Sequence, residues 1–390
     1  MAYLGVRLGA GARTVRTPRN PERPSLRFVV TPADAATNLL PEWAVLSGAS
    51  TGDNIFVHPD FAVPAMRHLG ADVAVAALAH PGARLAALAP FTKTRLGRIA
   101  PAVRLWSHDY APLGLPLIDR EAVAASVAAL LHGLAPATSG LTFMAADIPL
   151  DGPVAAAFAT AARRNNRPVD ILDAHVRAML ARSDAGALDP RAALPAKRRK
   201  QLARQMRRLA EVGEVKIAAT IDPVAVRARF EQFMGLEAAG WKGKGGSALN
   251  SSPATMEFAR EAVANRADAG AVRIDSIDVD GRPIAMLVSF VGGETAFTWK
   301  IAYDETYARF SPGAQLMLEA ATGIFADPTI ARIDSCASAD HPMVDHLWSG
   351  RFAIGTIVIG PPGGSMLHRV GLALARAELA GRAAVRRLRT

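Results

Sequence analysis

The chain has 390 residues, half of them apolar, which is enough to bury a large core and to form two domains. Its single cysteine, Cys336, excludes an internal disulfide framework and favours a reducing compartment. The net charge of +10 suits a nucleic acid, a polyanionic cofactor, an anionic polymer or a membrane face, and it does not choose among them.

The first 25 residues are rich in arginine and lack a continuous apolar core of signal-peptide length. We therefore predict a disordered basic arm rather than a targeting sequence. The most apolar later stretch, Ala122–Ala146, is broken by Gly133, Pro136 and Gly140, so no membrane span is predicted. A cytoplasmic location is the resulting expectation.

The first half of the chain alternates strand and helix patterns. Two expected strands, Asp72–Ala79 and Arg84–Phe91, flank the turn residues Pro81-Gly82. The elements expected next are strand Val103–Ser107, helix Arg120–Leu131, strand Leu141–Ala146, helix Gly152–Arg164 and strand Pro168–Ala174. Before its first helix this half has Tyr110–Asp119, a turn without a phosphate-binding pattern, so we expect this half to be a scaffold or a substrate wall.

A domain boundary is expected at Arg182–Pro195, where proline and aspartate punctuate the sequence. The basic segment Lys197–Arg208 follows and is expected to be helical, with an apolar stripe at Leu202, Met206 and Leu209. Its cations can pair with phosphates. A solvated helix that joins two domains is the favoured alternative, because no aromatic side chains are interleaved for base stacking.

A well-delimited helix is expected between Asp222 and Gly240. Asp222 is its N-cap, Pro223 its first residue, and Gly240 follows its end. Its apolar side chains at Val226, Phe230 and Phe233 face one way.

A glycine-rich run with two lysines, WKGKGGS, begins directly after this helix at Trp241. Glycines can direct successive N–H groups towards one anion, and lysines add positive charge. The alternative is a flexible loop whose glycines only stop the helix, and Trp241 favours a pocket wall over that alternative. The candidate substrate-binding residues here are Trp241, Lys242, Gly243, Gly245 and Gly246.

The second half repeats the order of the first. Strands Val272–Val279 and Arg282–Phe290 flank Asp280-Gly281, a strong hairpin signal. The elements expected next are strand Ala296–Tyr303, helix Gly313–Phe325, strand Ile330–Cys336, helix Pro342–Ser349 and strand Ile354–Ile359. The matched order predicts a duplicated α+β unit, with chance recurrence as the alternative.

The segment Thr298–Leu316 carries the strongest functional signal, because a strand runs into a helix that begins at Ser311-Pro312-Gly313. Ser311 can cap this helix and Pro312 suits its first position. A bare helix N-terminus of this kind binds anions such as a pyrophosphate.

Several polar residues near this segment are candidates for chemistry. Trp299 suits a core position, and Tyr303 ends the strand. Lys300 lies on the opposite face of the strand and is therefore expected at a polar cleft or at the edge of the sheet. Asp334, within a strand expected to be buried, is either a base with a shifted pKa or a structural carboxylate. His341 and His346 do not share a helix face, so no metal pair is expected, and Cys336 is expected to be a core residue.

These segments resemble the GNAT-type acetyltransferases of the CelD-like group, named for its association with cellulose and exopolysaccharide biosynthesis. The resemblance covers nearly the whole chain after the basic arm and is carried by Asn54–Met66, Gly114–Asp119, Leu236–Leu249, Gly281–Ala285, Trp299–Leu316, Asp334 and Trp348. The group is related to the Fem-type peptidyltransferases, which pair two GNAT-like domains and carry a basic helical segment. The resemblance thus implies an α+β (mixed α/β) fold of tandem GNAT-like domains, each a mixed twisted sheet flanked by helices.

The resemblance also implies an acyl-CoA site. GNAT enzymes hold the pyrophosphate on a loop of the form (Gln/Arg)-x-x-Gly-x-(Gly/Ala), and the corresponding run Arg309–Ala314 has Pro312 in place of the first glycine. Proline lacks an N–H, and losing a charge-assisted hydrogen bond of roughly 1.5–3 kcal/mol predicts about tenfold or more weaker CoA binding. Arg309, Ser311 or Lys300 can compensate. The residues implied for the cofactor are Arg309, Ser311, Gly313, Ala314 and Gln315.

The expected function is transfer of an acyl group from acetyl-CoA or another acyl-CoA to an amine or hydroxyl acceptor, in polysaccharide or cell-envelope biosynthesis, without a metal. Asp334 or His341 is the expected base and Tyr303 the expected acid, with Trp241–Gly246, Trp299 and Lys300 at the acceptor. An aminoacyl-tRNA-dependent, Fem-like transferase and a non-catalytic GNAT-like scaffold remain as alternatives.

The expected organisation is a basic arm at 1–25, an N-terminal GNAT-like domain at 26–185, a linker with the basic helix at 186–216, a C-terminal acyltransferase domain at 217–365 and a basic helix at 366–390.

Overall fold

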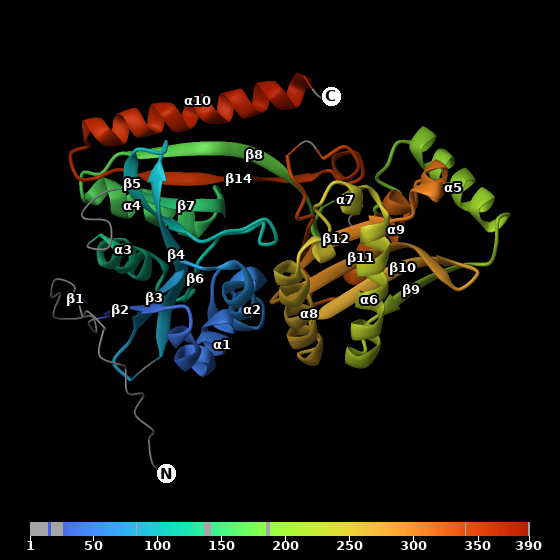
Figure 1. Cartoon of the computed structure of the whole chain (residues 1–390), viewed down its shortest axis with the longest axis horizontal. Helices are drawn as coiled ribbons and strands as arrows, with labels where there is room; N and C mark the ends of the chain where they lie inside the picture. The colour runs from blue at the N-terminus through green and yellow to red at the C-terminus, as the bar shows by residue number, and fades with distance from the viewer. Residues whose placement is uncertain are drawn as a thin grey trace, which may run out of the picture. The chain divides into compact units, whose positions relative to one another are not determined.

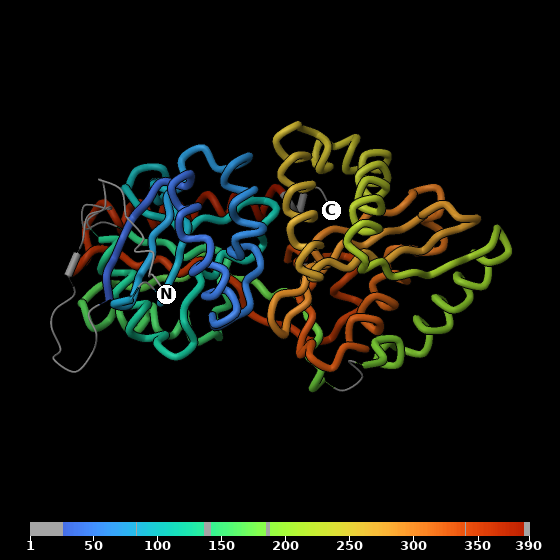
Figure 2. The backbone as a smooth tube through the Cα atoms, turned by 90° about the horizontal axis from the view of Figure 1, so that it is seen from below, coloured from blue at the N-terminus to red at the C-terminus, as the bar shows by residue number. Residues whose placement is uncertain are grey.

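The computed structural model describes residues 15–16, 26–82, 84–135, 142–184, 188–339 and 341–388. The chain forms two compact units (Figures 1 and 2). The first comprises Met1–Pro59, Gly70–His175 and Ala353–Thr390, and the second comprises Asp60–Leu69 and Val176–Phe352. The chain therefore passes between the units more than once.

The first unit is a mixed sheet flanked by helices. Its strands, in sheet order, are β1 (Val15–Arg16), β2 (Arg27–Pro32), β3 (Ala74–Ala79), β4 (Leu85–Leu96), β5 (Ala100–Leu105), β7 (Thr142–Pro149), β14 (Gly350–Ile359) and β8 (Val169–Ala181), with β6 (Leu117–Ile118) paired to β4. Strands β5 and β7 are parallel, whereas β2 to β5 form an antiparallel meander. Its helices are α1 (Leu40–Ala49), α3 (Val123–Leu134), α4 (Pro153–Arg164) and α10 (Met366–Leu388), with short 3₁₀ turns η1 (Ala35–Leu39) and η2 (Ile55–Val57).

The second unit repeats this plan. Its sheet order is β8, β13 (Arg332–Asp334), β12 (Thr295–Tyr303), β11 (Arg282–Gly292), β10 (Val272–Val279) and β9 (Val215–Thr220). Only β12 and β13 pair in parallel among the strand pairs described for this sheet. Its helices are α2 (Pro59–Leu69), α5 (Ala196–Ala210), α6 (Pro223–Ala239), α7 (Trp241–Lys244), α8 (Pro253–Asp268) and α9 (Pro312–Phe325), with 3₁₀ turns η4 (Leu249–Ser251), η5 (Glu305–Phe310) and η6 (Val344–His346).

The structure confirms the expected mixed fold and most of the expected elements. The β10–β11 hairpin turns at Asp280 and Gly281, both with positive φ (50° and 77°), as a tight two-residue hairpin requires. Asp222 caps α6 by accepting the Ala225 N–H at 2.9 Å. The basic segment is the helix α5, and its predicted stripe residues Leu202 and Leu209 are buried.

Three sequence predictions need correction. The helix expected at Pro342–Ser349 is only the short turn η6, because the carbonyls of Asp345 and Trp348 accept from the Arg351 side chain instead of from a following helical turn. The strand expected at Ile330–Cys336 is limited to β13, since Cys336 takes a left-handed φ of 53° that ends it. Of the expected disordered arm, Val15–Arg16 instead pair with β2, and the rest lies outside the described residues.

The last strand of each half is divided between the units. β8 begins in the first unit and ends in the second, where Leu180 pairs with Ile333 of β13. β14 begins in the second unit and ends in the first, where Ile357 pairs with Ala145 of β7. Within β8, the chain passes from the first unit to the second between His175 and Val176. This point comes before Arg182–Pro195, where the sequence predicts a domain boundary.

Helix α2 comes from the N-terminal half of the sequence but belongs to the second unit. Phe61 is fully buried and makes edge-to-face contacts with the rings of Phe258 (5.2 Å), Phe290 (5.6 Å) and Trp299 (6.0 Å). The Asp60 carboxylate lies 3.5 Å from the guanidinium of Arg266 in α8, and this ion pair is a second contact that fixes α2. This ring cluster anchors α2 against β11 and β12, because such ring pairs add to the burial of their surface.

Within the described part of the chain, no helix combines the length and the apolar character that a membrane crossing requires.

We predict that Phe61→Ala lowers the free energy of unfolding by about 3–5 kcal/mol, since it leaves a cavity within a ring cluster. Urea unfolding followed by tryptophan fluorescence measures this loss. The control Val45→Ala, at a position 65% exposed in α1, is expected to change stability by less than about 0.5 kcal/mol. Equal losses in the two variants would contradict the anchoring of α2.

Candidate active site

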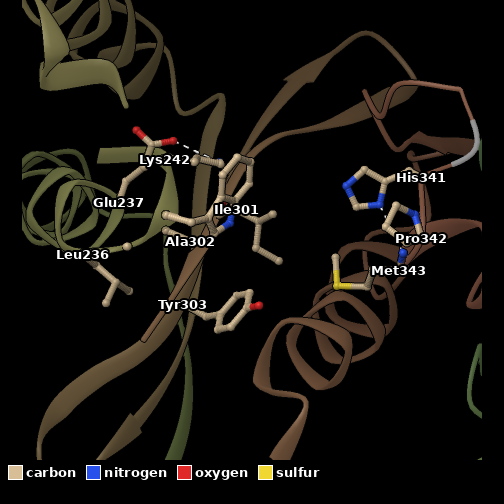
Figure 3. A pocket seen from close by; sticks show the side chains of 11 residues that line it. Leu236, Glu237, Lys242, Ile301, Ala302, Tyr303, His341, Pro342 and Met343 are labelled. Carbon is tan, nitrogen blue, oxygen red and sulfur yellow. Dashed lines mark hydrogen bonds and ion pairs between the residues drawn. The ribbon is translucent and has the colours of Figure 1, made fainter. Parts of the chain in front are cut away.

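A pocket of about 440 Å³ lies in the second unit beside the end of β12 (Figure 3). β12 pairs with β13 only at Thr295–Phe297, and the strand then continues alone on that side to Tyr303. The space beside this extension is the pocket. Its lining residues are Leu236, Glu237, Gly240, Trp241, Lys242, Ile301, Ala302, Tyr303, His341, Pro342 and Met343.

A β-bulge in β12 precedes the pocket. Val288 of β11 pairs with Lys300 and the next residue, Ser289, pairs with Thr298, so Trp299 is the extra residue. Trp299 is buried in the ring cluster around Phe61, and the Lys300 ammonium lies 5.9 Å from the Trp299 ring. Neither residue lines the pocket, although both were expected at the acceptor. Bulges of this kind bend a strand and often adjoin active sites.

A buried ion pair forms one wall of the pocket. The Lys242 Nζ donates to Glu237 Oε1 at 3.0 Å and to the carbonyl oxygen of Ile301 at 2.8 Å. Glu237 Oε2 accepts the Leu249 N–H at 2.8 Å, and the Glu237 side chain is fully buried. Both carboxylate oxygens are therefore hydrogen-bonded, as a buried polar group requires.

Helix α7 places Lys242 at this wall. A Cβ at Gly243 would lie 1.8 Å from the carbonyl oxygen of Ala238, so only glycine allows this turn to pack on the end of α6. The N–H groups of Lys244, Gly245 and Gly246 donate to the carbonyls of residues 240, 241 and 243. The interpretation of this run as an anion-binding set of N–H groups is therefore wrong, because those groups are already bonded. Trp241, 59% exposed, lines the pocket as expected for a wall.

His341 faces the ion pair from the opposite wall (Figure 3). Its Nδ1 accepts the N–H groups of Met343 at 3.3 Å and Val344 at 3.4 Å, which assigns the proton of the neutral ring to Nε2. Burial lowers the pKa of His341, and the charge of Lys242 adds to this effect, while Asp345 opposes it. The imidazole is thus neutral at pH 7 and presents a donor, Nε2–H.

The first turn of α9 lies directly behind the pocket. A Cβ at Gly313 would be 3.2 Å from the Met343 sulfur and 3.5 Å from the Tyr303 ring. These two side chains therefore separate the pocket from the helix start, and Gly313 and Ala314 are buried beneath them. None of the expected cofactor residues Arg309–Gln315 lines the pocket.

Helix α5 covers the start of α9 from outside. The Gln205 amide donates to the Arg309 carbonyl at 2.8 Å and to the Ser311 hydroxyl at 3.1 Å. Gln315 donates to the Leu202 carbonyl at 2.7 Å and accepts from Arg191 at 3.0 Å. These side chains hold α5 against α9.

Ser311 occupies the N-cap position of α9 but does not cap it. Its φ of 53° is left-handed, and its side chain makes no capping hydrogen bond, so the predicted capping is wrong. The Ser311 N–H donates to the Ala308 carbonyl and Pro312 has no N–H. The first-turn donors that remain are the N–H groups of Gly313 and Ala314, which have no partner within the helix. The Arg309 guanidinium stacks on the ring of Phe310, 4.7 Å away.

Asp334 lies outside the pocket. Its carboxylate is 3.4 Å from the buried Arg177 of β8 and accepts the Cys336 N–H at 2.8 Å. Burial raises the pKa of the Cys336 thiol, and the charge of Asp334 adds to it, so this cysteine is a protonated thiol at pH 7.

Glu237 is the pocket residue that the sequence interpretation missed. It follows Val226, Phe230 and Phe233 at the spacing of one helix face, and all four are buried. A carboxylate at a core position of an apolar stripe is the signal for a buried, paired charge. Among the described residues, no three His, Cys, Asp or Glu side chains gather as a metal site requires.

Comparison with known proteins identifies the segment that carries the pocket. Residues 196–341 match the family described as acetyltransferase (GNAT) domain, and this segment includes Glu237, Lys242, Tyr303 and His341. The chain has no match among curated protein sequences.

Solved structures share the fold at low sequence identity. A conserved protein of unknown function from Bacteroides thetaiotaomicron VPI-5482 is 11% identical over 83% of this chain and 97% of its own, with a TM-score of 0.53. FemX is 8% identical over 82% and 95% (TM-score 0.52), and a C-terminal DUF2156 domain from Agrobacterium fabrum is 10% identical over 88% and 96% (TM-score 0.52). The chain thus shares its fold with these structures and has a mixed sheet flanked by helices in each unit.

We predict that Lys242→Met destabilises the protein by about 3 kcal/mol, because it leaves the Glu237 carboxylate buried without its cation. The double variant Glu237→Gln/Lys242→Met is expected to lose less than the sum of the single variants, by at least about 1 kcal/mol. Chemical unfolding of the four proteins gives this coupling.

The exposed pair Lys244–Glu305 is the matched control, since its lysine is 72% exposed. Lys244→Met is expected to cost less than about 1 kcal/mol. Additive losses at Glu237 and Lys242 would show that the two side chains do not act as a pair.

Proposed function

We propose that the second unit is a GNAT-type acyltransferase that moves an acyl group from acyl-CoA to an amine or hydroxyl acceptor. The observation that carries this proposal is the pocket at the free extension of β12, within the segment that matches the acetyltransferase domain. The CelD-like resemblance of the sequence supports a glycan or cell-envelope acceptor.

The lining side chains suit direct transfer. The acceptor attacks the thioester carbonyl, its proton passes to a base, and the thiolate sulfur leaves and takes up a proton. We assign the base to the Glu237 carboxylate, because Glu237 lines the pocket whereas Asp334 lies outside it. The Nε2–H of His341 donates to the carbonyl oxygen as negative charge develops there, and the Tyr303 hydroxyl protonates the leaving sulfur.

The carrier site is the part of the proposal that the geometry constrains most. A pyrophosphate at Arg309–Ala314 would meet two free first-turn N–H groups, and Gln205 lies over Ser311 and Arg309. Binding of acyl-CoA there requires the Gln205 side chain to move away from the Arg309 carbonyl and the Ser311 hydroxyl. We therefore expect CoA to bind weakly and to bind more tightly when this amide is removed.

We predict that Gln205→Ala tightens CoA binding by about threefold to tenfold, because it removes the amide that is bonded over Arg309 and Ser311. Titration calorimetry with CoA and acetyl-CoA measures the affinity. Arg198→Ala, on the same helix but away from Ser311, is the control and is expected to leave the affinity unchanged. No heat with millimolar CoA in either Gln205→Ala or the unmodified protein would overturn acyl-CoA as the donor.

A second candidate, transfer from an aminoacyl-tRNA, is favoured by one face of α5. Lys197, Lys200, Arg204, Arg207 and Arg208 recur at helical spacing. These five side chains are exposed or nearly so, and none forms an ion pair with a described residue. The opposite side of the same helix packs on η5 and on the start of α9, so the cationic face is turned towards solvent.

This candidate predicts that the full chain binds tRNA at low salt, with affinity that falls steeply as salt rises. Neutralising Lys197, Lys200 and Arg204 to glutamine is expected to weaken binding at least about tenfold and to reduce the salt slope by two to three charges, roughly one unit per contact. Gel shifts across a salt series measure both quantities. The control replaces Arg260, Arg227 and Arg67, which are paired with carboxylates, by glutamine.

Failure of both CoA and tRNA binding would favour the non-catalytic scaffold. The start of α9 is covered by Gln205, Tyr303 and Met343, and this observation supports the scaffold alternative.

A further inference from the structure

Helix α10 is fixed on the sheet of the first unit by its inner face. Leu372 is buried with Leu96 and Val358, and Leu379 packs against the same cluster. A Cβ at Gly371 would lie 2.8 Å from the Leu96 carbonyl oxygen, so helix and strand are in close contact. The helix therefore cannot rotate about its own axis, and this packing determines which side chains lie on its outer face.

The outer face carries a second apolar stripe. Five of its large apolar side chains are exposed, namely Met366 (70%), Leu367 (45%), Val370 (42%), Leu374 (45%) and Val385 (51%). At 3.6 residues per turn, Met366, Val370, Leu374 and Val385 lie on the side opposite to Leu372 and extend over about 30 Å. In Figure 1, α10 runs along the margin of its unit, and no described element of that unit lies beyond it. A helix that is apolar on two opposite faces is typical of one covered on both.

Arginines border this stripe. Arg369 and Arg376 lie along one side, and Arg382 lies along the other with Glu378. The Glu378 carboxylate accepts from Arg98 at 2.9 Å and from Arg382 at 2.7 Å, so two cations face one anion. Arg376 is paired with Asp170 at 2.8 Å, so the excess positive charge of the border lies at Arg369 and at the group of Arg98, Arg382 and Glu378.

We propose that the outer face of α10 docks on a membrane surface that contains anionic lipids, with the helix lying in the plane of the surface. The apolar stripe would enter the boundary between headgroups and acyl chains, and the bordering arginines would meet lipid phosphates. A second copy of the chain fits this face less well. In a two-fold antiparallel helix pair the same borders meet, which would bring Arg369 towards the Arg376 of the second copy. This docking surface is independent of the proposed transfer reaction.

The test is sedimentation of the full chain with vesicles of phosphatidylcholine alone or with about 30 mol % phosphatidylglycerol, the anionic lipid that attracts basic segments. Strong binding is expected only to the anionic vesicles, and Val370→Glu/Leu374→Glu is expected to weaken it at least about tenfold, because both changes place charge at the apolar boundary.

The control, Val45→Glu/Val224→Glu, makes the same change of charge at valines that are 65% and 75% exposed elsewhere. It is expected to bind vesicles almost as well as the unmodified chain, and unchanged thermal unfolding shows that both double variants fold. Equal loss in the two variants would mean general charge attraction and would overturn the proposal. A dimer in light scattering that Val370→Glu/Leu374→Glu dissociates, or no binding to anionic vesicles at low salt, would also overturn it.

Discussion

The ion pair between Glu237 and Lys242 is the interaction on which the candidate site depends. It joins the end of α6 to α7, and through the Ile301 carbonyl and the Leu249 N–H it also joins β12 and η4. Removing two charges from water is costly, and the attraction between them offsets that cost only when their remaining hydrogen bonds are also made. Here both Glu237 oxygens and two Lys242 protons are used, so the wall of the pocket is held in one arrangement. A rigid polar wall is what a reacting group needs in order to be positioned.

The helix start of α9 illustrates how the same sequence signal can lead to a different structure. The sequence places serine, proline and glycine where a strand turns into a helix, and this pattern is typical of an anion site. In the structure, Tyr303 and Met343 cover that turn from the pocket and Gln205 covers it from α5. Two of these three side chains, Gln205 and Met343, come from distant parts of the sequence, so the local pattern alone does not decide whether the site is open.

The elements that the sequence predicted well are those that local chemistry specifies. Asp222 and Gly240 delimit α6 because a cap and a helix-ending glycine act within one turn, and Asp280-Gly281 defines its hairpin for the same reason. Lys242, Tyr303 and His341 were predicted and lie in one pocket, whereas Asp334 and Trp299 are held elsewhere by Arg177 and Phe61. The partners of those two residues come from β8 and α2, far away in the sequence. Long-range pairing of this kind lies beyond what spacing and composition can specify.

The two units differ at the strand that pairs in parallel with its neighbour, β5 in the first unit and β12 in the second. β5 of the first unit, like β12, pairs in parallel with the next strand, but it ends at Leu105 just after its last pair at Arg104. The chain then places the His108 ring 4.7 Å from that of Trp106 and 6.2 Å from that of Tyr110. Burial lowers the pKa of His108 to about 4, so these packed rings hold a neutral imidazole. Where β12 extends to Tyr303 beside the pocket, β5 of the first unit is shorter and is followed by packed aromatic side chains.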